Sequence, residues 1–263
     1  MAIRFACVII LTLFGTNSCF AQKVQPAGVG IVLLHGKGGR PSGSIATLGQ
    51  ALSAQSIKVA LPEMAWSGRG GKVSNYDVSY EQALSSIDTA ISNLRAQGAS
   101  KIIIAGHSLG ANAALAYAAL RSKKISGVIA IAPGHMPERM KLPDIQKALT
   151  EARQKISAQL GNQRATFPDI NSGERFEVSG TYMGWFSYFD PNGTAVMSKN
   201  ASRLTVPLLY IVGRSDPLSS VGRNYIFDKA RPNSKNRYIE VDAGHLDTPD
   251  RSTTPILEWL KKL

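Results

Sequence analysis

Short apolar runs alternate with longer amphipathic segments along most of the chain. Residues 28–34 are apolar without alternation, which is typical of a strand buried on both faces. Five further segments also predict strands, at residues 58–61, 101–105, 128–132, 208–212 and 237–241. Residues 43–56 favour a helix, apolar positions from Tyr80 to Leu94 recur at helical spacing before Gly98, and residues 254–263 predict a final helix.

Strands that alternate with helices predict an α/β fold with a parallel sheet covered by helices on both faces. In such sheets, ligands bind at the carboxyl ends of the strands. Residues 135–203 interrupt the alternation because they are too long for a simple crossover. They contain a helical stripe from Ile145 to Leu160 and an aromatic tract at residues 182–189. We interpret this segment as a cap insertion over the strand ends. A surface excursion that packs for stability only is the alternative.

The first 21 residues have the pattern of an export signal. A short basic start precedes the apolar residues 5–14, which are too few to span a bilayer, and small residues lead to a cleavage site after Ala21. We therefore expect a signal peptide at residues 1–21, a mature domain at residues 22–263 without a transmembrane segment, and a periplasmic or extracellular location. An uncleaved anchor is the alternative. Both cysteines, Cys7 and Cys19, lie in the signal, which leaves no thiol chemistry to the mature chain.

The formal net charge of +12 comes from dispersed lysines and arginines. This distribution favours a solubilising surface, and no nucleic acid partner is expected. A non-catalytic protein that binds an anionic polymer is the alternative from a different functional class.

The segment 106–110 has the sequence Gly-His-Ser-Leu-Gly and joins the strand at 101–105 to a helix of small residues. A serine at such a turn projects its hydroxyl from the end of the sheet, and the flanking glycines remove Cβ atoms that would clash in the tight bend. Ser108 is therefore the predicted nucleophile.

A serine nucleophile needs a base within hydrogen-bond reach, and the base needs an orienting acid. His245 follows the sixth predicted strand and is the expected base. Asp216 follows the fifth strand and precedes a proline, so it is the expected acid. Asp190 and Asp242 are the competing acids.

Glycines after the first strand, in residues 35–39, allow backbone amides to converge where a tetrahedral intermediate carries its negative oxygen. The expected donors to this oxyanion are the amides of Lys37 and Leu109. A phosphate-binding loop is the competing interpretation, but the glycine spacing matches neither phosphate-binding pattern.

The order Ser108, Asp216, His245, with the His35-Gly36 turn upstream, resembles the α/β-hydrolase superfamily. The resemblance implies attack by Ser108 on an acyl carbon and an acyl-enzyme intermediate that water cleaves. There is no room for the two antiparallel strands that often precede the first parallel one, so we expect a reduced, mostly parallel sheet of about six strands. The expected activity is hydrolysis of a small-molecule acyl ester. A thioesterase, lactonase or amidase on the same residues is the alternative.

The aromatic tract of the cap suggests an apolar acyl or aryl group in the substrate. Four residues are predicted to contact substrate: His35, Trp66, His107 and Trp185. No cofactor is expected, and no metal either, because the histidines are far apart in sequence and lack cysteine partners. The sequence leaves the oligomeric state open.

Overall fold

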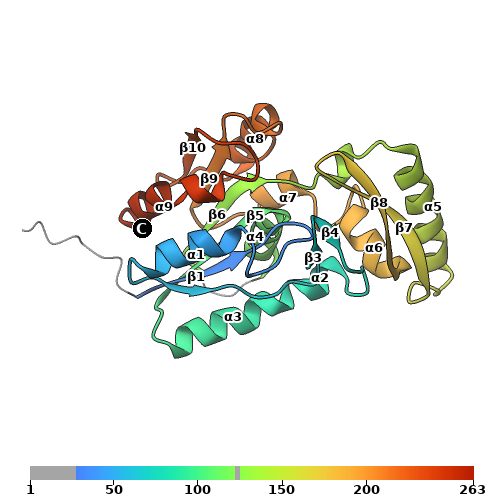
Figure 1. Ribbon diagram of the computed structural model, residues 1–263, viewed down its shortest axis with the longest axis horizontal. Coiled ribbons are helices and arrows are strands. Elements are labelled where there is room, and N and C mark those ends of the chain that lie inside the picture. The colour runs from blue at the N-terminus through green and yellow to red at the C-terminus, as the bar shows by residue number, and fades with distance from the viewer. Residues whose placement is uncertain (1–27, 122–124) are drawn as a thin grey trace, which may run out of the picture.

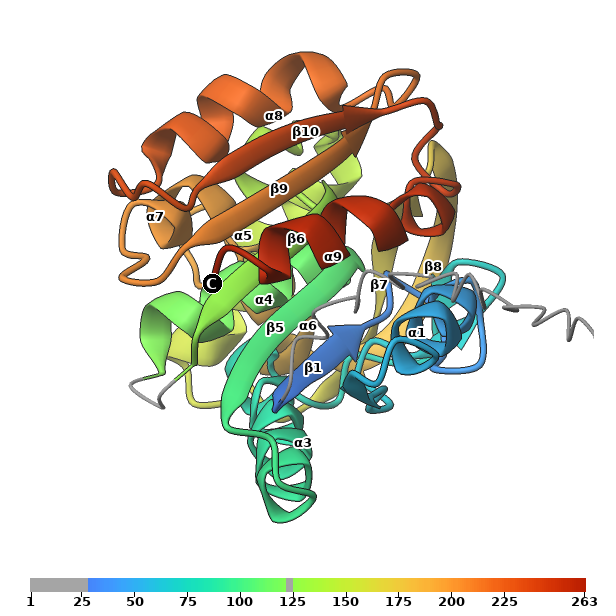
Figure 2. The same cartoon turned by 90° about the vertical axis from the view of Figure 1, so that its left-hand side faces the viewer.

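The computed structural model describes residues 28–121 and 125–263. The predicted signal peptide and both cysteines lie outside these ranges. The described residues form a central sheet of six strands in the order β10-β9-β6-β5-β1-β2, and every neighbouring pair is parallel (Figures 1 and 2). The predicted reduced parallel sheet is confirmed. The strands are β1 Val29–Leu34, β2 Lys58–Ala60, β5 Lys101–Ser108, β6 Gly127–Pro133, β9 Leu208–Gly213 and β10 Arg237–Val241.

Helices cover both faces of the sheet, as expected for parallel strands. Figure 2 shows α9 in front of the strands and α4 behind them, and α1 packs in the same hydrophobic cluster as α9. The predicted helix that starts at Tyr80 is broken at Leu84 into α2 and α3, and a capping box between Ser79 and Gln82 starts the first piece. The helices outside the cap are α1 Ile45–Ser53, α2 Tyr80–Ala83, α3 Ser85–Ala96, α4 Leu109–Leu120, α8 Ser219–Tyr225 and α9 Thr253–Leu260, with 3-10 turns at Phe227–Lys229 and Pro249–Arg251.

Successive residues of the central strands contribute to two separate hydrophobic cores. In β1, Ile31 and Leu33 lie in the cluster that includes α1 and α9. The alternate residues Val32 and Leu34 lie in the cluster that includes α3 and α4. Because both faces are covered, the strand has no polar position, which explains the absence of alternation in its sequence.

Residues 135–203, which we call the cap, form a compact unit between β6 and β9. The predicted helical stripe is α5, and the aromatic tract is α6. The β7–β8 hairpin between them was not predicted, and its turn has Ser172 and Gly173 at φ +49° and +84°. Figure 1 shows α5, α6 and this hairpin together at one end of the molecule. The cap elements are a 3-10 turn at Pro137–Arg139, α5 Pro143–Ser157, β7 Arg164–Asn171, β8 Glu174–Thr181, α6 Tyr182–Phe189 and α7 Met197–Ala201.

The cap packs closely on the segment that leads into α2. The amide of Tyr76 donates to the carbonyl of Ser179 at 2.9 Å, and the amide of Thr181 donates to the carbonyl of Tyr76 at 3.1 Å. A Cβ atom at Gly184 would lie 2.0 Å from the Tyr76 carbonyl oxygen, so this approach requires glycine. A further two-stranded hairpin, β3 Gly68–Arg69 with β4 Lys72–Val73, contacts the cap through β8. None of the helices in the described part of the chain is both long and apolar enough to span a bilayer.

Candidate active site

Ser108 occupies a strained turn between β5 and α4. Its backbone has φ 55° and ψ −119°, a conformation that L residues adopt only when the surrounding structure imposes it. A Cβ atom at Gly106 would lie 2.3 Å from the carbonyl carbon of Gly110, and a Cβ atom at Gly110 would lie 2.4 Å from the carbonyl oxygen of Leu34. The two glycines of the motif are therefore required by close backbone approach.

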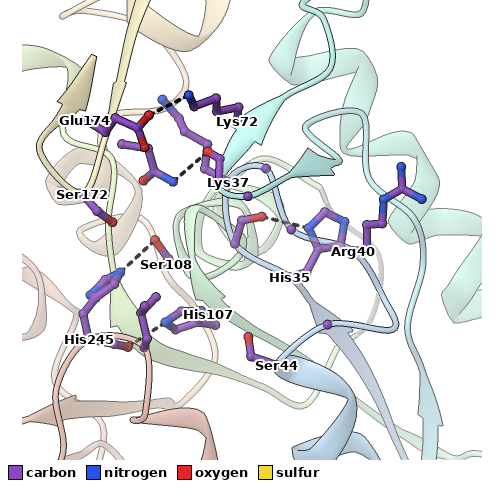
Figure 3. Close-up of a pocket in the computed structure, with 18 of the residues that line it drawn as sticks. His35, Lys37, Arg40, Ser44, Lys72, His107, Ser108, Ser172, Glu174 and His245 are labelled. Atoms are coloured by element: carbon purple, nitrogen blue, oxygen red, sulfur yellow. Dashed lines mark hydrogen bonds and ion pairs between the residues drawn. The ribbon is translucent and has the colours of Figure 1, made fainter. Parts of the chain in front are cut away.

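The structure brings the three predicted residues together. Nε2 of His245 lies 3.1 Å from Oγ of Ser108, and Nδ1 of His245 lies 2.8 Å from Oδ2 of Asp216 (Figure 3). A carboxylate can only accept a hydrogen bond, so the neutral imidazole carries its proton on Nδ1. The lone pair on Nε2 then faces the serine hydroxyl, as a general base requires.

Asp216 is held as a buried carboxylate, with 3% of its surface exposed. Burial alone would raise its pKa. The hydrogen bonds from His245 and from the Leu218 amide, which reaches Oδ1 at 2.8 Å, outweigh burial and lower the pKa below its usual value. Of the competing acids, Asp190 instead accepts a hydrogen bond from the Asn192 amide at 3.0 Å, and Asp242 is exposed. The geometry favours Asp216.

His107 supports the loop that carries His245. Its Nε2 lies 2.9 Å from the carbonyl oxygen of His245, and the two rings have centroids 5.0 Å apart. Because a carbonyl only accepts, Nε2 carries the ring proton. Burial and the neighbouring His245 lower the pKa of His107 to about 4, which keeps the ring neutral. His107 borders a pocket beside Ser108, but its donor is used by the backbone.

The loop after β1 passes directly against Ser108. A Cβ atom at Gly36 would lie 3.2 Å from Cβ of Ser108. His35 fixes this loop, since its Nε2 accepts from the Met64 amide at 3.2 Å and its Nδ1 lies 2.9 Å from the Gly36 carbonyl oxygen. Burial lowers the pKa of His35. The loop therefore has a defined path beside the candidate nucleophile.

Two of the predicted substrate contacts are wrong. Trp66 is fully buried, donates from Nε1 to the carbonyl of His35 at 2.9 Å and stacks on Tyr80. Trp185 is also fully buried, in a stack with Phe167 and Phe189 at centroid distances of 4.9 and 4.6 Å. Both indoles lie in the hydrophobic cluster that includes α3 and α4, which removes them from contact with a ligand.

Two pockets meet at Ser108. The apolar pocket has a volume of about 800 Å³. Its apolar lining includes Met136, Met140, Ile170, Leu218 and Leu246, with Lys37 and Leu109 near the serine.

The glycine-lined pocket has a volume of about 390 Å³ and also borders Ser108 (Figure 3). Backbone forms much of its wall, at Gly36, Gly38, Gly39, Gly43, Gly70 and Gly71, together with Arg40 and Lys72. Six residues border both pockets: Lys37, Ser108, Asn171, Ser172, His245 and Leu246.

Sequence reasoning missed three residues that shape these pockets. A Cβ atom at Gly134 would lie 2.8 Å from Oγ of Ser108, so the chain after β6 closes one side of the nucleophile. Its position immediately after a predicted strand was an available signal. Asn171 and Ser172, at the tip of the unpredicted hairpin, border the site from the cap.

Comparison with known proteins places the chain in a family. The family model described as serine aminopeptidase, S33, matches residues 25–181, which is more than half of the chain. The chain belongs to the S33 family of α/β-hydrolases. Among curated proteins, no sequence matches this S33 family member.

Solved structures similar to this S33 family member include lipolytic enzymes and esterases. One of the metagenome-derived lipolytic enzymes LipS and LipT is 18% identical, with a TM-score of 0.62 and coverage of 90% of this chain and 94% of its own. The monoacylglycerol lipase of Paleococcus ferrophilus is 23% identical, with a TM-score of 0.61 and coverage of 89% and 94%. Est1E from Butyrivibrio proteoclasticus with bound ferulic acid is 15% identical, with a TM-score of 0.61 and coverage of 92% and 91%. At these identities the likeness shows the fold alone. It confirms the predicted α/β-hydrolase fold.

Proposed function

We propose that this S33 family member is a serine hydrolase that cleaves carboxylic esters through an acyl-enzyme intermediate. The observation that carries the proposal is the continuous hydrogen-bonded chain from Ser108 through His245 to Asp216, with distances of 3.1 and 2.8 Å. Each link has the donor and acceptor that proton transfer from a serine requires.

In the proposed mechanism, Oγ of Ser108 attacks the acyl carbon while His245 takes the hydroxyl proton on Nε2. The negative oxygen of the tetrahedral intermediate accepts hydrogen bonds from the amides of Lys37 and Leu109, each contributing on the order of 3 kcal/mol to transition-state stabilisation. The C–O bond then breaks, and the departing alcohol takes the proton from His245. Water then attacks the acyl carbon of the acyl-enzyme with His245 again as the base, which releases the acid and regenerates Ser108.

The two pockets support an orientation for the substrate. The apolar pocket suits an aliphatic or aryl acyl group, since each buried methylene contributes about 0.8 kcal/mol to binding. The glycine-lined pocket offers backbone groups and the polar side chains of Asn171 and Ser172, which suit a small polar alcohol. We therefore place the acyl group in the apolar pocket and the alcohol in the glycine-lined pocket.

Cleavage of an amide bond is a second candidate, favoured by the description of the matching family as a serine aminopeptidase. An aminopeptidase has to hold the free ammonium group of its substrate, and a carboxylate would serve that purpose. Glu174 is the acidic residue among those that line the glycine-lined pocket, and it is paired with Lys72 at 2.6 Å. This pairing supports the ester as the first choice.

A fluorophosphonate probe tests the proposed nucleophile. We expect the probe to label the wild-type protein and to leave Ser108→Ala unlabelled, whereas Ser92→Ala, on an exposed part of α3, should label like wild type. A panel of p-nitrophenyl esters, a thioester and an aminoacyl anilide then ranks the reactions. Folded wild-type protein that is neither labelled nor active on any of these substrates would rule out the hydrolase. Salt-dependent binding of an anionic polymer that Ser108→Ala leaves unchanged would then favour the binding protein.

Export is part of the proposal, supported by the basic start, the apolar residues 5–14 and the small residues before Gln22. We expect the mature protein to begin at Gln22 and to be recovered from the periplasm or the medium. N-terminal sequencing of the protein from its native host tests this, and an intact Met1 on the active protein would refute cleavage.

A further inference from the structure

Lys37 and Asp169 form an ion pair that is closed to solvent, between the loop after β1 and the cap. Nζ of Lys37 lies 2.6 Å from Oδ1 of Asp169, and the two side chains are 4% and 0% exposed. The residues are 132 positions apart in sequence. The pair therefore connects two distant segments of the chain at a buried point.

The surroundings of the pair hold both charges in one geometry. Oδ2 of Asp169 accepts from the Tyr76 hydroxyl at 2.8 Å, and Oδ1 also accepts from the Ile170 amide at 2.7 Å. Nζ of Lys37 donates in addition to the Ile170 carbonyl at 3.2 Å and lies 5.0 Å from the centre of the Phe189 ring. Both oxygens of the carboxylate are thus engaged.

Each partner sits next to a part of the candidate site. The backbone amide of Lys37 is one of the two proposed donors to the oxyanion. Asp169 precedes the hairpin tip, where Asn171 and Ser172 border both pockets. Asn171 also donates from Nδ2 to the Gly71 carbonyl at 2.8 Å, which ties the tip to the wall of the glycine-lined pocket.

Stability alone is a poor explanation for this arrangement. Removing two charges from water costs free energy that their attraction repays only in part, and well-packed apolar replacements of buried ion pairs are often as stable or more stable. A buried pair whose hydrogen bonds are all satisfied instead fixes the relative position of the two segments, because its hydrogen-bond geometry permits only one placement.

We propose that the Lys37–Asp169 pair is the positioning device of the site, holding the anion-stabilising loop and the hairpin tip at a fixed distance across Ser108. This inference rests on the proposed function for its catalytic consequence. The side chain of Lys37 acts through the placement of its own backbone amide, and Asp169 acts through the placement of the tip.

The kinetic test replaces the whole network with apolar side chains, as Lys37→Met, Asp169→Leu and Tyr76→Phe in one variant. This variant leaves no buried charge unpaired, although the Ile170 amide and carbonyl lose their side-chain partners, so we expect it to fold with an unfolding midpoint close to that of wild type. We expect kcat to fall at least 30-fold and KM to change less than threefold, with fluorophosphonate labelling slowed in proportion to kcat. A folded triple variant whose kcat stays within threefold of wild type would overturn the proposal.

The matched control is Arg164→Gln, which removes an exposed ion pair with Asp77 at the far end of the same hairpin. Arg164 lines neither pocket. We expect its kcat/KM to stay within twofold of wild type. An equal loss in this variant would show that any weakening of the hairpin has the same effect, and it would contradict a specific role for the buried pair.

Hydrogen exchange tests the coupling without reference to catalysis. In Asp169→Asn, or in the triple variant if that protein does not fold, we expect the amides of Gly38 and Gly39 and those of residues 170–174 to exchange at least tenfold faster together. Faster exchange on one side alone would refute the coupling. If wild type is inactive on every ester, the proposed function fails while this measurement still decides whether the two segments are held as one unit.

Discussion

Replacing Gly134 with alanine is expected to disable the nucleophile while leaving the fold intact. The new Cβ atom would lie 2.8 Å from Oγ of Ser108, closer than non-bonded carbon and oxygen atoms approach. Its next contacts are ordinary, at 3.6 Å from Cα of Ser108 and 3.7 Å from Cε1 of His245. The overlap therefore falls on one atom at the end of a short side chain.

That atom can move away at low cost. Rotation of Ser108 about its Cα–Cβ bond into another staggered position relieves the contact, so the free energy of unfolding should fall by less than about 1 kcal/mol. The same rotation takes Oγ away from Nε2 of His245, which now lies at 3.1 Å. Loss of general-base assistance reduces rates by roughly 10²- to 10⁴-fold, or about 3–5 kcal/mol in the barrier.

The assay compares kcat/KM on a p-nitrophenyl ester, the rate of fluorophosphonate labelling and the urea unfolding midpoint. Gly244→Ala is the matched control, since its Cβ atom would meet nothing closer than 3.6 Å although it neighbours His245. A Gly134→Ala protein that keeps more than a third of wild-type kcat/KM would refute the reasoning. So would a loss of activity that is explained entirely by unfolding.

Three further predictions concern stability and substrate choice. The pKa of His107 is about 4 in the folded protein against 6.5 in the unfolded chain, so the unfolded chain binds more protons between these values and stability is lost as the pH falls from 6.5 to 4. His107→Gln should reduce this loss by about 3 kcal/mol when the free energy of unfolding is measured by urea titration at several pH values. An unchanged dependence of that free energy on pH would contradict the prediction. Gly222→Ala, whose Cβ atom would lie 2.0 Å from the Tyr210 hydroxyl oxygen, should cost about 1–3 kcal/mol of stability, and Tyr210→Phe in the same chain should restore part of it. Met140→Trp should shorten the preferred acyl chain by filling the apolar pocket, and an unaltered chain-length profile of kcat/KM would count against the assigned orientation.

The body of the fold could be predicted from sequence because its signals are local. Most of the six strands appear as short apolar runs, and their parallel order brings the residues that follow them to one edge of the sheet. This rule, together with the Gly-His-Ser-Leu-Gly motif and the need of a serine nucleophile for a base and an acid, made Ser108, Asp216 and His245 the candidates. Their observed hydrogen bonds agree with that expectation, although their catalytic roles stay predictions.

The cap was harder to predict because its signals conflict. The β7–β8 hairpin contains Pro168, which disfavours a strand, whereas Ser172 and Gly173 form a turn typical of hairpins. Trp66 was expected at the ligand because it follows the second predicted strand, and Trp185 because it belongs to the aromatic tract of the cap. A single sequence does not distinguish an aromatic side chain that fills a core from one that borders a pocket. Likewise, no local pattern links Lys37 to a carboxylate on β7.

The cluster that contains α3 and α4 continues without interruption into the cap, through Tyr76, Tyr80 and Tyr188. A lid that opens about a hinge needs an interface at which the lid and the body can separate. Here the interface between the cap and the sheet domain is filled by the packed rings of these tyrosines. Cap and sheet should therefore melt in one cooperative transition. Substrate should therefore enter through a permanent opening. As the ester concentration is raised past the point at which micelles form, the reaction rate should increase smoothly. A lid that opens at a lipid–water interface would instead produce an abrupt increase in rate.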